Sequence, residues 1–112
     1  MDCSASKQDS AVIITVAGRL DANTAPEFKQ ECDVWIQRNE HHLVVDFAGL
    51  SYISSAGLRS ILSLTKALKQ HRGTLAICGM KDMVAEVFTV SGFSSYIPVF
   101  PSVEEALTGV CS

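Results

Sequence analysis

Two alternating patterns of apolar residues divide this chain into strands and helices. Short runs of apolar and β-branched residues, bounded by turn-forming residues, predict strands over residues 3–8, 11–17, 43–47, 75–78 and 96–100. Between these runs, apolar residues recur every three or four positions, which predicts helices over residues 24–38, 55–70 and 82–90, with a short helix after Ser102. Strands that alternate with helices favour right-handed crossovers and a largely parallel sheet.

The predicted fold is a single α/β domain that covers residues 1–112. Its sheet is mixed because the first two strands form an antiparallel hairpin, whereas the later strands are joined through helices. The consecutive apolar residues over 43–47 indicate a strand that is buried on both faces. Pro98 places the last strand at an edge, since proline donates no hydrogen bond to a neighbour. We therefore predict a mixed, mostly parallel sheet of about five strands with about four helices.

Local signals predict where helices begin and which side they bury. Thr24 and Glu27 have the spacing of a capping box, and Ser102 and Glu105 repeat that spacing before the last helix. For the helix over residues 55–70, helical periodicity predicts an inner face made of Leu58, Ile61, Leu62, Thr65 and Leu68.

Composition narrows the possible classes of function. Of the 112 residues, 47% are hydrophobic, which is enough to build one core without disulfide or metal staples. A formal net charge of −3 argues against bulk electrostatic binding to nucleic acid or to an anionic membrane. No apolar run approaches the ~20 residues of a membrane span, and the N-terminus lacks the apolar segment of a signal peptide. The expected location is therefore the cytoplasm, without membrane insertion or direct contact with nucleic acid.

Neither a cofactor nor a metal is expected. The four cysteines show no C-x-x-C spacing and are spread along the chain as Cys3, Cys32, Cys78 and Cys111. Cys32 and Cys78 lie in apolar contexts and are expected in the core. The adjacent His41 and His42 would point to opposite faces of a strand, so they are expected to be solvated and not to share a metal.

The segment LVVDFAGLSYISSAGLRSIL, from Leu43 to Leu62, carries the candidate site. A short apolar strand ends at Asp46, a compact loop follows, and two hydroxyls, Ser54 and Ser55, precede the next helix. The N–H groups at the start of that helix and the positive end of its dipole would face these hydroxyls. Because a phosphoryl group would be stabilised there, the segment suits a phosphorylation switch that a partner protein reads.

Three stretches, read together, carry a resemblance to a known family. They are GRLDANTAPEF at residues 18–28, the segment 43–62, and LAICGMKDMVAEVFTVSGF at residues 75–93. In order and spacing they resemble the STAS-domain family and, within it, the bacterial anti-sigma factor antagonists. The resemblance implies that a serine kinase, itself the anti-sigma factor, uses ATP to phosphorylate a hydroxyl at the start of the second helix. The unphosphorylated form binds this kinase and releases its sigma factor; the phosphorylated form does not bind, and a PP2C-type phosphatase restores it.

The chain departs from the family's motif at the phosphorylation position. That motif reads Asp-Ser-(Ser/Thr)-Gly-Leu, with the acceptor directly before the glycine, and the matching residues here are Ser54, Ser55, Ala56, Gly57 and Leu58. Alanine therefore stands at the usual acceptor position, and serine replaces the usual aspartate. Ser55 is the preferred acceptor; the alternatives are that the chain is not phosphorylated, or that Ser54 accepts the phosphate. Ser54 also suits the N-cap of the helix.

Candidate partner-binding residues surround the two serines. They are Asp21, Asp46, Ser54, Ala56, Gly57, Arg59 and Met80. Asp21 matches the carboxylate of the family's GxLD motif and either presents the serine loop to the kinase or accepts hydrogen bonds in its own loop. Asp46 would order the loop above it, and Gly57 would allow close approach by a partner or by a neighbouring loop. Met80 would contact a partner, whereas Met83 is expected to pack in the core.

Two other classes of function stay open. A receiver-type phosphoacceptor also carries an aspartate after its third strand, as Asp46 does, but it needs an acidic pair where residues 17–19 read Ala-Gly-Arg. A small doubly wound enzyme would need a base near Ser55, and neither G-x-x-x-x-G-K-[ST] nor G-x-G-x-x-G occurs. We therefore do not expect an enzyme. A non-phosphorylated STAS scaffold in a signalling or transport complex is the stronger alternative, because Ala56 occupies the usual acceptor position.

Overall fold

Five strands lie side by side in the order in which the chain forms them. The computed structural model describes residues 1–95 and 97–111, which form β1 (Asp2–Gln8), β2 (Ala11–Leu20), α1 (Ala25–Gln37), β3 (His42–Ile53), α2 (Ser55–Gln70), β4 (Thr74–Cys78), α3 (Asp82–Val90), a 3₁₀ turn (Phe93–Ser95), β5 (Val99–Phe100) and α4 (Val103–Cys111). Strand β1 pairs antiparallel with β2, and β3, β4 and β5 follow in parallel. The predicted mixed sheet, its hairpin and the edge position of the last strand are therefore confirmed; Tyr96, the expected first residue of that strand, lies outside the described residues.

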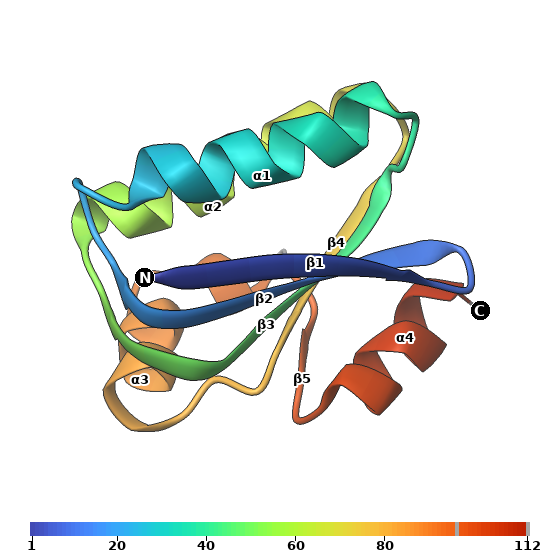
Figure 1. The fold of residues 1–112 in the computed structure, drawn as a ribbon. Coiled ribbons are helices and arrows are strands. Elements are labelled where there is room, and N and C mark those ends of the chain that lie inside the picture. Colours follow the sequence, from blue (N-terminus) through green and yellow to red (C-terminus); the bar gives the residue numbers. More distant parts are fainter. Residues whose placement is uncertain (96, 112) are drawn as a thin grey trace.

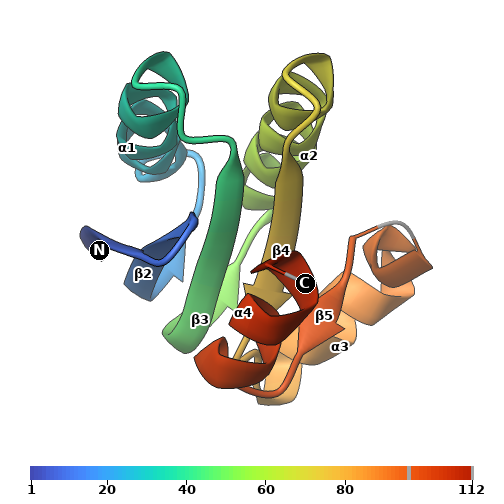
Figure 2. The ribbon, with the colours of Figure 1, turned by 90° about the vertical axis from the view of Figure 1, so that its right-hand side faces the viewer.

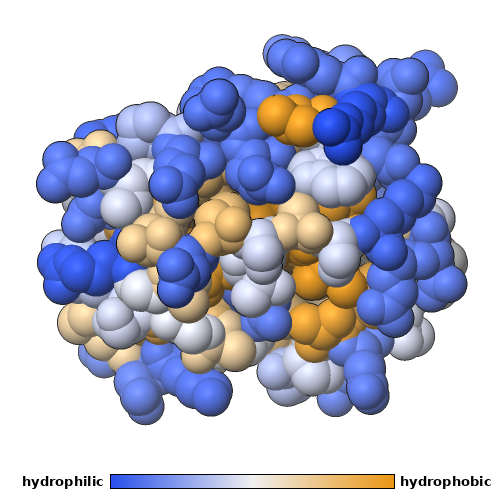
Figure 3. All heavy atoms as spheres, viewed as in Figure 1, coloured by the Kyte–Doolittle hydropathy of each residue, from blue (hydrophilic) through white to orange (hydrophobic). Residues whose placement is uncertain are grey.

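The helices cover the two faces of the sheet unequally. Helices α1 and α2 lie side by side across one face (Figure 1 and Figure 2), and α3 adds Val84 and Phe88 to the same core. Helix α4 covers part of the opposite face, where Ala106 and Leu107 pack against a smaller apolar cluster. Because neighbouring residues of a strand point to opposite faces, the central strands supply both clusters, which explains their continuous apolar runs. The outer surface of α1 is mostly hydrophilic (Figure 3), as expected for a helix that buries one side.

Strands β2 and β3 extend beyond their predicted ends. Strand β3 separates from β4 after Asp46 but stays paired with β2 as far as Ile53, which lies opposite Leu20. Gly18, with a φ of 98°, does not end β2 but lies where the pairing register shifts. These register shifts break the two-residue alternation on which strand prediction depends. The compact loop expected after Asp46 is therefore wrong: this segment continues β3.

The two predicted capping boxes have different outcomes. The hydroxyl of Ser102 accepts a hydrogen bond from the backbone N–H of Glu105 (3.3 Å), as predicted. The side chain of Thr24 does not cap α1, so this prediction is wrong. Its hydroxyl donates to the carbonyl of Arg19 (2.8 Å) and accepts from the N–H of Asp21 (2.9 Å), so it is used within the loop that precedes the helix.

His41 and His42 are half-buried and are not the solvated residues that the sequence suggests. The ring of His41 stacks on that of His71 with the centroids 4.5 Å apart. Nδ1 of His42 lies 2.9 Å from Oγ1 of Thr74. These contacts join the start of β3 to the end of α2 and the start of β4, at the opposite end of α2 from the serines.

The buried side of α2 is turned relative to the predicted one. Ile61, Thr65 and Leu68 are buried as expected. Leu64, however, with only 6% of its surface exposed, takes the place assigned to Leu62, which is half-buried. The buried residues 61, 64, 65 and 68 follow the i, i+3, i+4, i+7 spacing of one side of a helix, and α2 packs against α1 as well as against the sheet (Figure 2). The assignment of Leu62 to the inner face is therefore wrong.

Replacing Leu64 should destabilise the fold more than replacing Leu62. Leu64→Ala should lower the free energy of unfolding by roughly 2–5 kcal/mol, the usual range for a buried leucine. Leu62→Ala should lower it by about 1 kcal/mol or less, because that side chain already lies partly in water. Urea denaturation followed by circular dichroism compares both variants within one helix, so that the change in helix propensity cancels. Equal losses would show that the buried side described here is wrong.

Candidate functional site

A single residue, Ser54, links strand β3 to helix α2. Its backbone N–H donates to the carbonyl of Leu20 on β2 (3.0 Å), and its hydroxyl accepts from the N–H of Gly57 (3.2 Å). Its own carbonyl accepts from the N–H of Leu58 (2.9 Å), which begins the helical hydrogen bonds. Ser54 is therefore the N-cap of α2, as predicted, and its hydroxyl oxygen is already engaged in the fold.

Ser55 occupies the first helical position, and its side chain is exposed. Within the described residues its hydroxyl has no hydrogen-bond partner. The N–H groups of Gly57 and Leu58 are bonded to Ser54, whereas those of Ser55 and Ala56 have no partner in the part of the chain that the structure describes. These two N–H groups and the positive end of the helix dipole make the surroundings of Ser55 favourable for an anion.

Gly57 is buried because the backbone of β2 passes directly beside it. A Cβ atom at this position would lie 2.7 Å from the carbonyl oxygen of Leu20 and 2.9 Å from Cγ1 of Ile53. Glycine leaves room for that carbonyl, which also accepts the N–H of Ser54. The close approach that Gly57 allows is therefore that of strand β2, and Gly57 supports the serines from inside the protein.

Asp21 organises the loop that follows β2. Its carboxylate accepts hydrogen bonds from the N–H groups of Asn23 (3.0 Å) and Thr24 (3.2 Å), and Nε of Arg19 lies 3.7 Å from Oδ2. Partial desolvation by itself would raise the pKa of Asp21. The donors from Asn23 and Thr24 and the charge of Arg19 together outweigh it, so the pKa lies below its ordinary value of 3.8. The charged form of Asp21 thus holds its own loop in place next to the end of β2.

Sequence reasoning missed Arg19 and Tyr52. The guanidinium of Arg19 lies 4.1 Å from the centroid of the Tyr52 ring, and the two residues are paired across β2 and β3. Tyr52 precedes Ser54 by two positions, so this cation and ring lie beside the serine site. Arg19 and Tyr52 meet because β2 and β3 extend beyond residues 17 and 47, where the predicted strands end. The sequence-based strands therefore contained neither residue.

Asp46 lies at the far end of the extended half of β3. Its Oδ1 accepts the N–H of Ala48 (3.0 Å) and would be 2.9 Å from a Cβ atom at Gly79. Burial, and then the charge of Asp46, raise the pKa of the Cys78 thiol to about 12. Since a strand rises ~3.3 Å per residue, the path from Asp46 to Ile53 places the carboxylate on the order of 20 Å from the serines. The structure therefore does not bring Asp46 to the serine site.

The remaining candidates lie on α2 and around α3. Arg59 is exposed on α2. Met80 is half-buried against the main core and lines a groove of about 410 Å³ with residues of α3 and β5. Met83 is 46% exposed, so the expectation that it packs in the core is wrong; the next residue, Val84, takes the buried position.

The structure thus groups most of the predicted site at the start of α2. The group consists of Ser54, Ser55, Ala56, Gly57 and Arg59, with the Asp21 loop at the end of the paired strand β2. Met80 belongs instead to the loop beside Asp46. Chemically, the group offers one exposed hydroxyl at a helix N-terminus.

The described residues show neither a cluster of metal ligands nor a membrane-spanning helix. Among the residues whose side chains the structure describes, 1–95 and 97–109, no three His, Cys, Asp or Glu side chains lie where they could jointly hold a metal ion. In the same part of the chain, no helix combines the length and the apolar character needed to cross a membrane.

The two serines should contribute differently to stability. Ser54→Ala removes the acceptor for the N–H of Gly57 and should lower the free energy of unfolding by about 1 kcal/mol. Ser55→Ala, which removes an exposed hydroxyl, should change it by less than about 0.5 kcal/mol. Urea denaturation of the two adjacent variants is the measurement. A larger loss for Ser55→Ala would contradict the assignment of Ser54 as the cap.

Asp21 should contribute stability that disappears in acid. Because its pKa is lower in the folded protein than the ordinary 3.8, its contribution is complete above that value and is lost as the pH falls through the folded pKa. Asp21→Asn should therefore be less stable than the wild type at pH 7, and the difference should shrink below about pH 4. Urea denaturation at several pH values tests this, with Asp2→Asn on the edge strand as control. A difference that is independent of pH would contradict the ionic origin.

Both the sequence and the fold match one family over almost the whole chain. The model of the family described as STAS domain matches residues 2–106. BtrV of Bordetella bronchiseptica, provisionally named an anti-sigma factor antagonist, is 39% identical over 100 residues, which cover 89% of this chain and 86% of that protein. The anti-sigma-B factor antagonist of Listeria monocytogenes is 32% identical over 96 residues, which cover 86% and 83%. A Thermotoga maritima crystal structure, provisionally described as an anti-sigma factor antagonist, has the same fold, with a TM-score of 0.92 at 18% identity over 98% of this chain and 95% of that chain. This protein therefore belongs to the STAS domain family.

Proposed function

We propose that this protein is an anti-sigma factor antagonist that binds a serine-kinase anti-sigma factor and is released from it by phosphorylation of Ser55. The observation that supports this most directly is the exposed Ser55 hydroxyl at the first position of α2. Relatives at 39% and 32% identity that bear the name of antagonist make the same class of partner the first choice for this chain. A cytoplasmic location fits a reaction that consumes ATP.

Ser55 is the best acceptor on structural grounds. The hydroxyl of Ser54 caps the helix and is half-buried, so phosphorylation there would remove the cap. Ala56 has no hydroxyl. Ser55 is exposed, and its own N–H and that of Ala56 have no partner among the residues that the structure describes. A phosphoryl group at Ser55 would therefore meet favourable local electrostatics.

The proposed reaction leaves the chain as substrate and ligand. The Ser55 oxygen bonds to the γ-phosphorus of ATP as the bond from that phosphorus to ADP breaks, and the hydroxyl proton passes to a base of the kinase. A PP2C-type phosphatase reverses the change when water attacks the phosphorus and the serine hydroxyl is released. The sequence contains no phosphate-binding loop motif, so ATP would be bound by the kinase.

Phosphorylation would act on the partner's surface and not on the fold. It adds about −1.5 to −2 charges at neutral pH. Arg59 lies four residues after Ser55, where side chains on a helix are neighbours, so its cation would attract this charge. The N-terminus of α2 would tolerate the phosphoryl group. A kinase surface that is complementary to a neutral Ser55 hydroxyl would not, so the kinase would dissociate.

A second candidate function is a STAS scaffold that is never phosphorylated. Ala56, at the family's usual acceptor position, is the observation that favours it. Such a scaffold would bind its partner without regard to ATP, so the experiment below separates the two functions.

Ser55 should be the residue that the kinase modifies. We expect the purified serine-kinase anti-sigma factor encoded nearest to this chain's gene to add one phosphoryl group from ATP. Site-resolved mass spectrometry should place it on Ser55. Ser55→Ala should stay unlabelled and bind constitutively, Ser55→Asp should bind weakly, and Ser54→Ala should still be labelled.

Each variant has an outcome that would contradict the proposal. If Ser55→Ala is labelled as completely as the wild type, the acceptor is a residue other than Ser55. A kinase that binds the wild type but never labels it would support the scaffold. Turnover of ATP by the chain alone, after removal of any contaminating kinase, would show that it is not merely a substrate.

A further inference from the structure

We propose that a second copy of this chain pairs with the free edge of β1, so that two sheets join into one across a two-fold axis beside Ala5. The two β1 strands would run antiparallel, and the two α1 helices would lie next to each other on one face. This surface is separate from the serine site. Helix α1 contacts β1 and β2, whereas α2, which carries Ser55, contacts β3 and β4.

The outer edge of β1 is open and regular. Within the described residues, β1 is the first strand of the sheet, so no other strand pairs with its outward N–H and C=O groups. All seven of its residues pair with consecutive residues of β2, so no bulge distorts the edge, and the strand contains no proline. Nζ of Lys7, its one cation, lies 2.6 Å from Oε2 of Glu40 in the same chain and does not cover the edge. An edge of this kind is a template for another strand.

Apolar side chains beside the open edge are only half covered. Cys3 and Ala5 of β1 and Trp35 of α1 pack against the main core, yet all three are half-buried. Burial, and then the charges of Glu31 and Glu27, raise the pKa of the Cys3 thiol to about 11, so these two carboxylates also lie on the β1 side of α1. A second copy at this edge would remove the apolar side chains from water, and the two cores would meet across the axis.

The side of α1 toward this edge is acidic at its start and basic at its end. Four residues, spaced four, four and three positions apart, lie on this side of the helix: Glu27, Glu31, Trp35 and Arg38. Nε1 of Trp35 donates to Oε1 of Glu31 (3.3 Å), and the guanidinium of Arg38 lies 5.2 Å from the centroid of the Trp35 ring. These contacts hold the side chains in one connected row.

Helix α1 and strand β1 run side by side in the same direction (Figure 1). Glu31 acts on Cys3 near the start of the strand, and Glu40, which follows the helix, pairs with Lys7 near the end of the strand. Ala5, midway along the strand, therefore lies beside the later half of the helix.

This arrangement is complementary to itself. A two-fold axis at Ala5 makes the two α1 helices antiparallel, so Glu31 of one copy faces Arg38 of the other. On the strands the same axis places Ser4 opposite Ser6 and brings no like charges together. Because α1 contacts both β1 and β2, and paired strands lie about 4.8 Å apart, the two helix axes would be roughly 10 Å apart, a distance that suits packed helices. An extended peptide would pair with the strand but leave the charges on α1 without partners, so a second copy is the better occupant.

The test is a charge swap across the proposed axis. Sedimentation equilibrium should show the wild type as a reversible dimer, and Arg38→Glu should raise the Kd of this dimer roughly tenfold or more, because like charges then meet twice across the axis. Glu31→Arg should do the same, and the double variant Glu31→Arg/Arg38→Glu should recover most of the affinity. Lys29→Glu is the control: it makes the same change of charge on the opposite side of α1, where Lys29 pairs with Asp33 of its own chain (2.9 Å), and it should leave the Kd unchanged. Fluorescence of Trp35, the one tryptophan, should move to shorter wavelength as the dimer forms.

Three outcomes would overturn the inference. A wild type that stays monomeric at the highest soluble concentration would leave the edge free or assign it to a strand of another protein. A dimer that Arg38→Glu and Glu31→Arg leave unchanged would have its interface elsewhere. A dimer that both single variants weaken, but that the double variant does not restore, would contradict the two-fold arrangement. Circular dichroism of each variant separates loss of the dimer from loss of the fold, and none of these results depends on whether Ser55 is phosphorylated.

Discussion

Helix α2 begins at Ser55 because the carbonyl of Leu20 reaches its first turn. That carbonyl accepts the N–H of Ser54 and would lie 2.7 Å from any Cβ atom at Gly57. It reaches this place only because β2 remains paired with β3 as far as Ile53. The register of two strands thus fixes the end of β3 and the start of α2 at once, with one residue between them. The contacts of Leu20 with Ser54 and Gly57 therefore fix the backbone on both sides of Ser55, the first helical residue.

Because of this arrangement, the hydroxyls of Ser54 and Ser55 have different surroundings. The hydroxyl of Ser54 completes the hydrogen bonding of the turn, since it accepts the N–H of Gly57. The hydroxyl of Ser55 is left exposed and unbonded within the described residues. In the proposed switch, stability and phosphorylation would therefore fall to different side chains, because a change at Ser55 leaves the hydrogen bonds of the turn in place.

Features of the fold and of the site could be predicted from the sequence where they depend on contacts between residues close together in the chain. The cap at Ser54 and the burial of Ile61, Thr65 and Leu68 were predicted correctly, because capping and helical periodicity depend on residues within one or two turns. The extension of β3 was not, since the shifts of register near Gly18 are a property of the pairing with β2. One error led to two others: Asp46 was placed near the serines, and the contact of Arg19 with Tyr52 was missed. The buried position of Leu64, in contrast, follows from local spacing, because residues 61, 64, 65 and 68 lie at i, i+3, i+4 and i+7, and the choice of Leu62 departed from this pattern.

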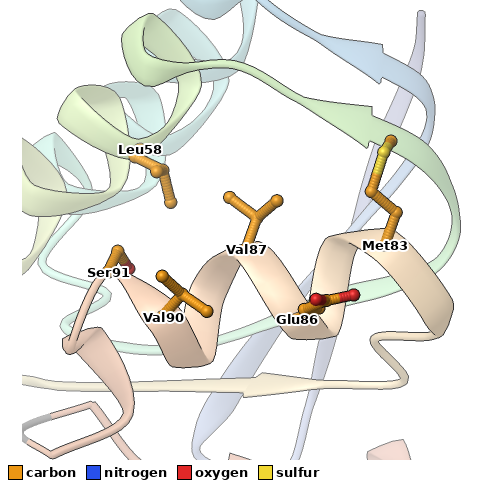
Figure 4. Close-up of a pocket in the computed structure, with 6 residues that line it drawn as sticks. All are labelled: Leu58, Met83, Glu86, Val87, Val90 and Ser91. Carbon is orange, nitrogen blue, oxygen red and sulfur yellow. The ribbon is translucent and has the colours of Figure 1, made fainter.

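The proposed acceptor, Ser55, lies one position before Ala56, which changes the side of α2 on which the hydroxyl lies. Successive residues of a helix are about 100° apart around its axis, so a serine at 55 and a hydroxyl at 56 would face different neighbours. A hydroxyl at position 56 would lie beside Arg59 and Ser60, three and four residues later. Ser55 lies beside Arg59 and beside Leu58, which points toward α3 (Figure 4). A group attached to Ser55 would therefore meet an apolar residue and a cation on the same side of α2.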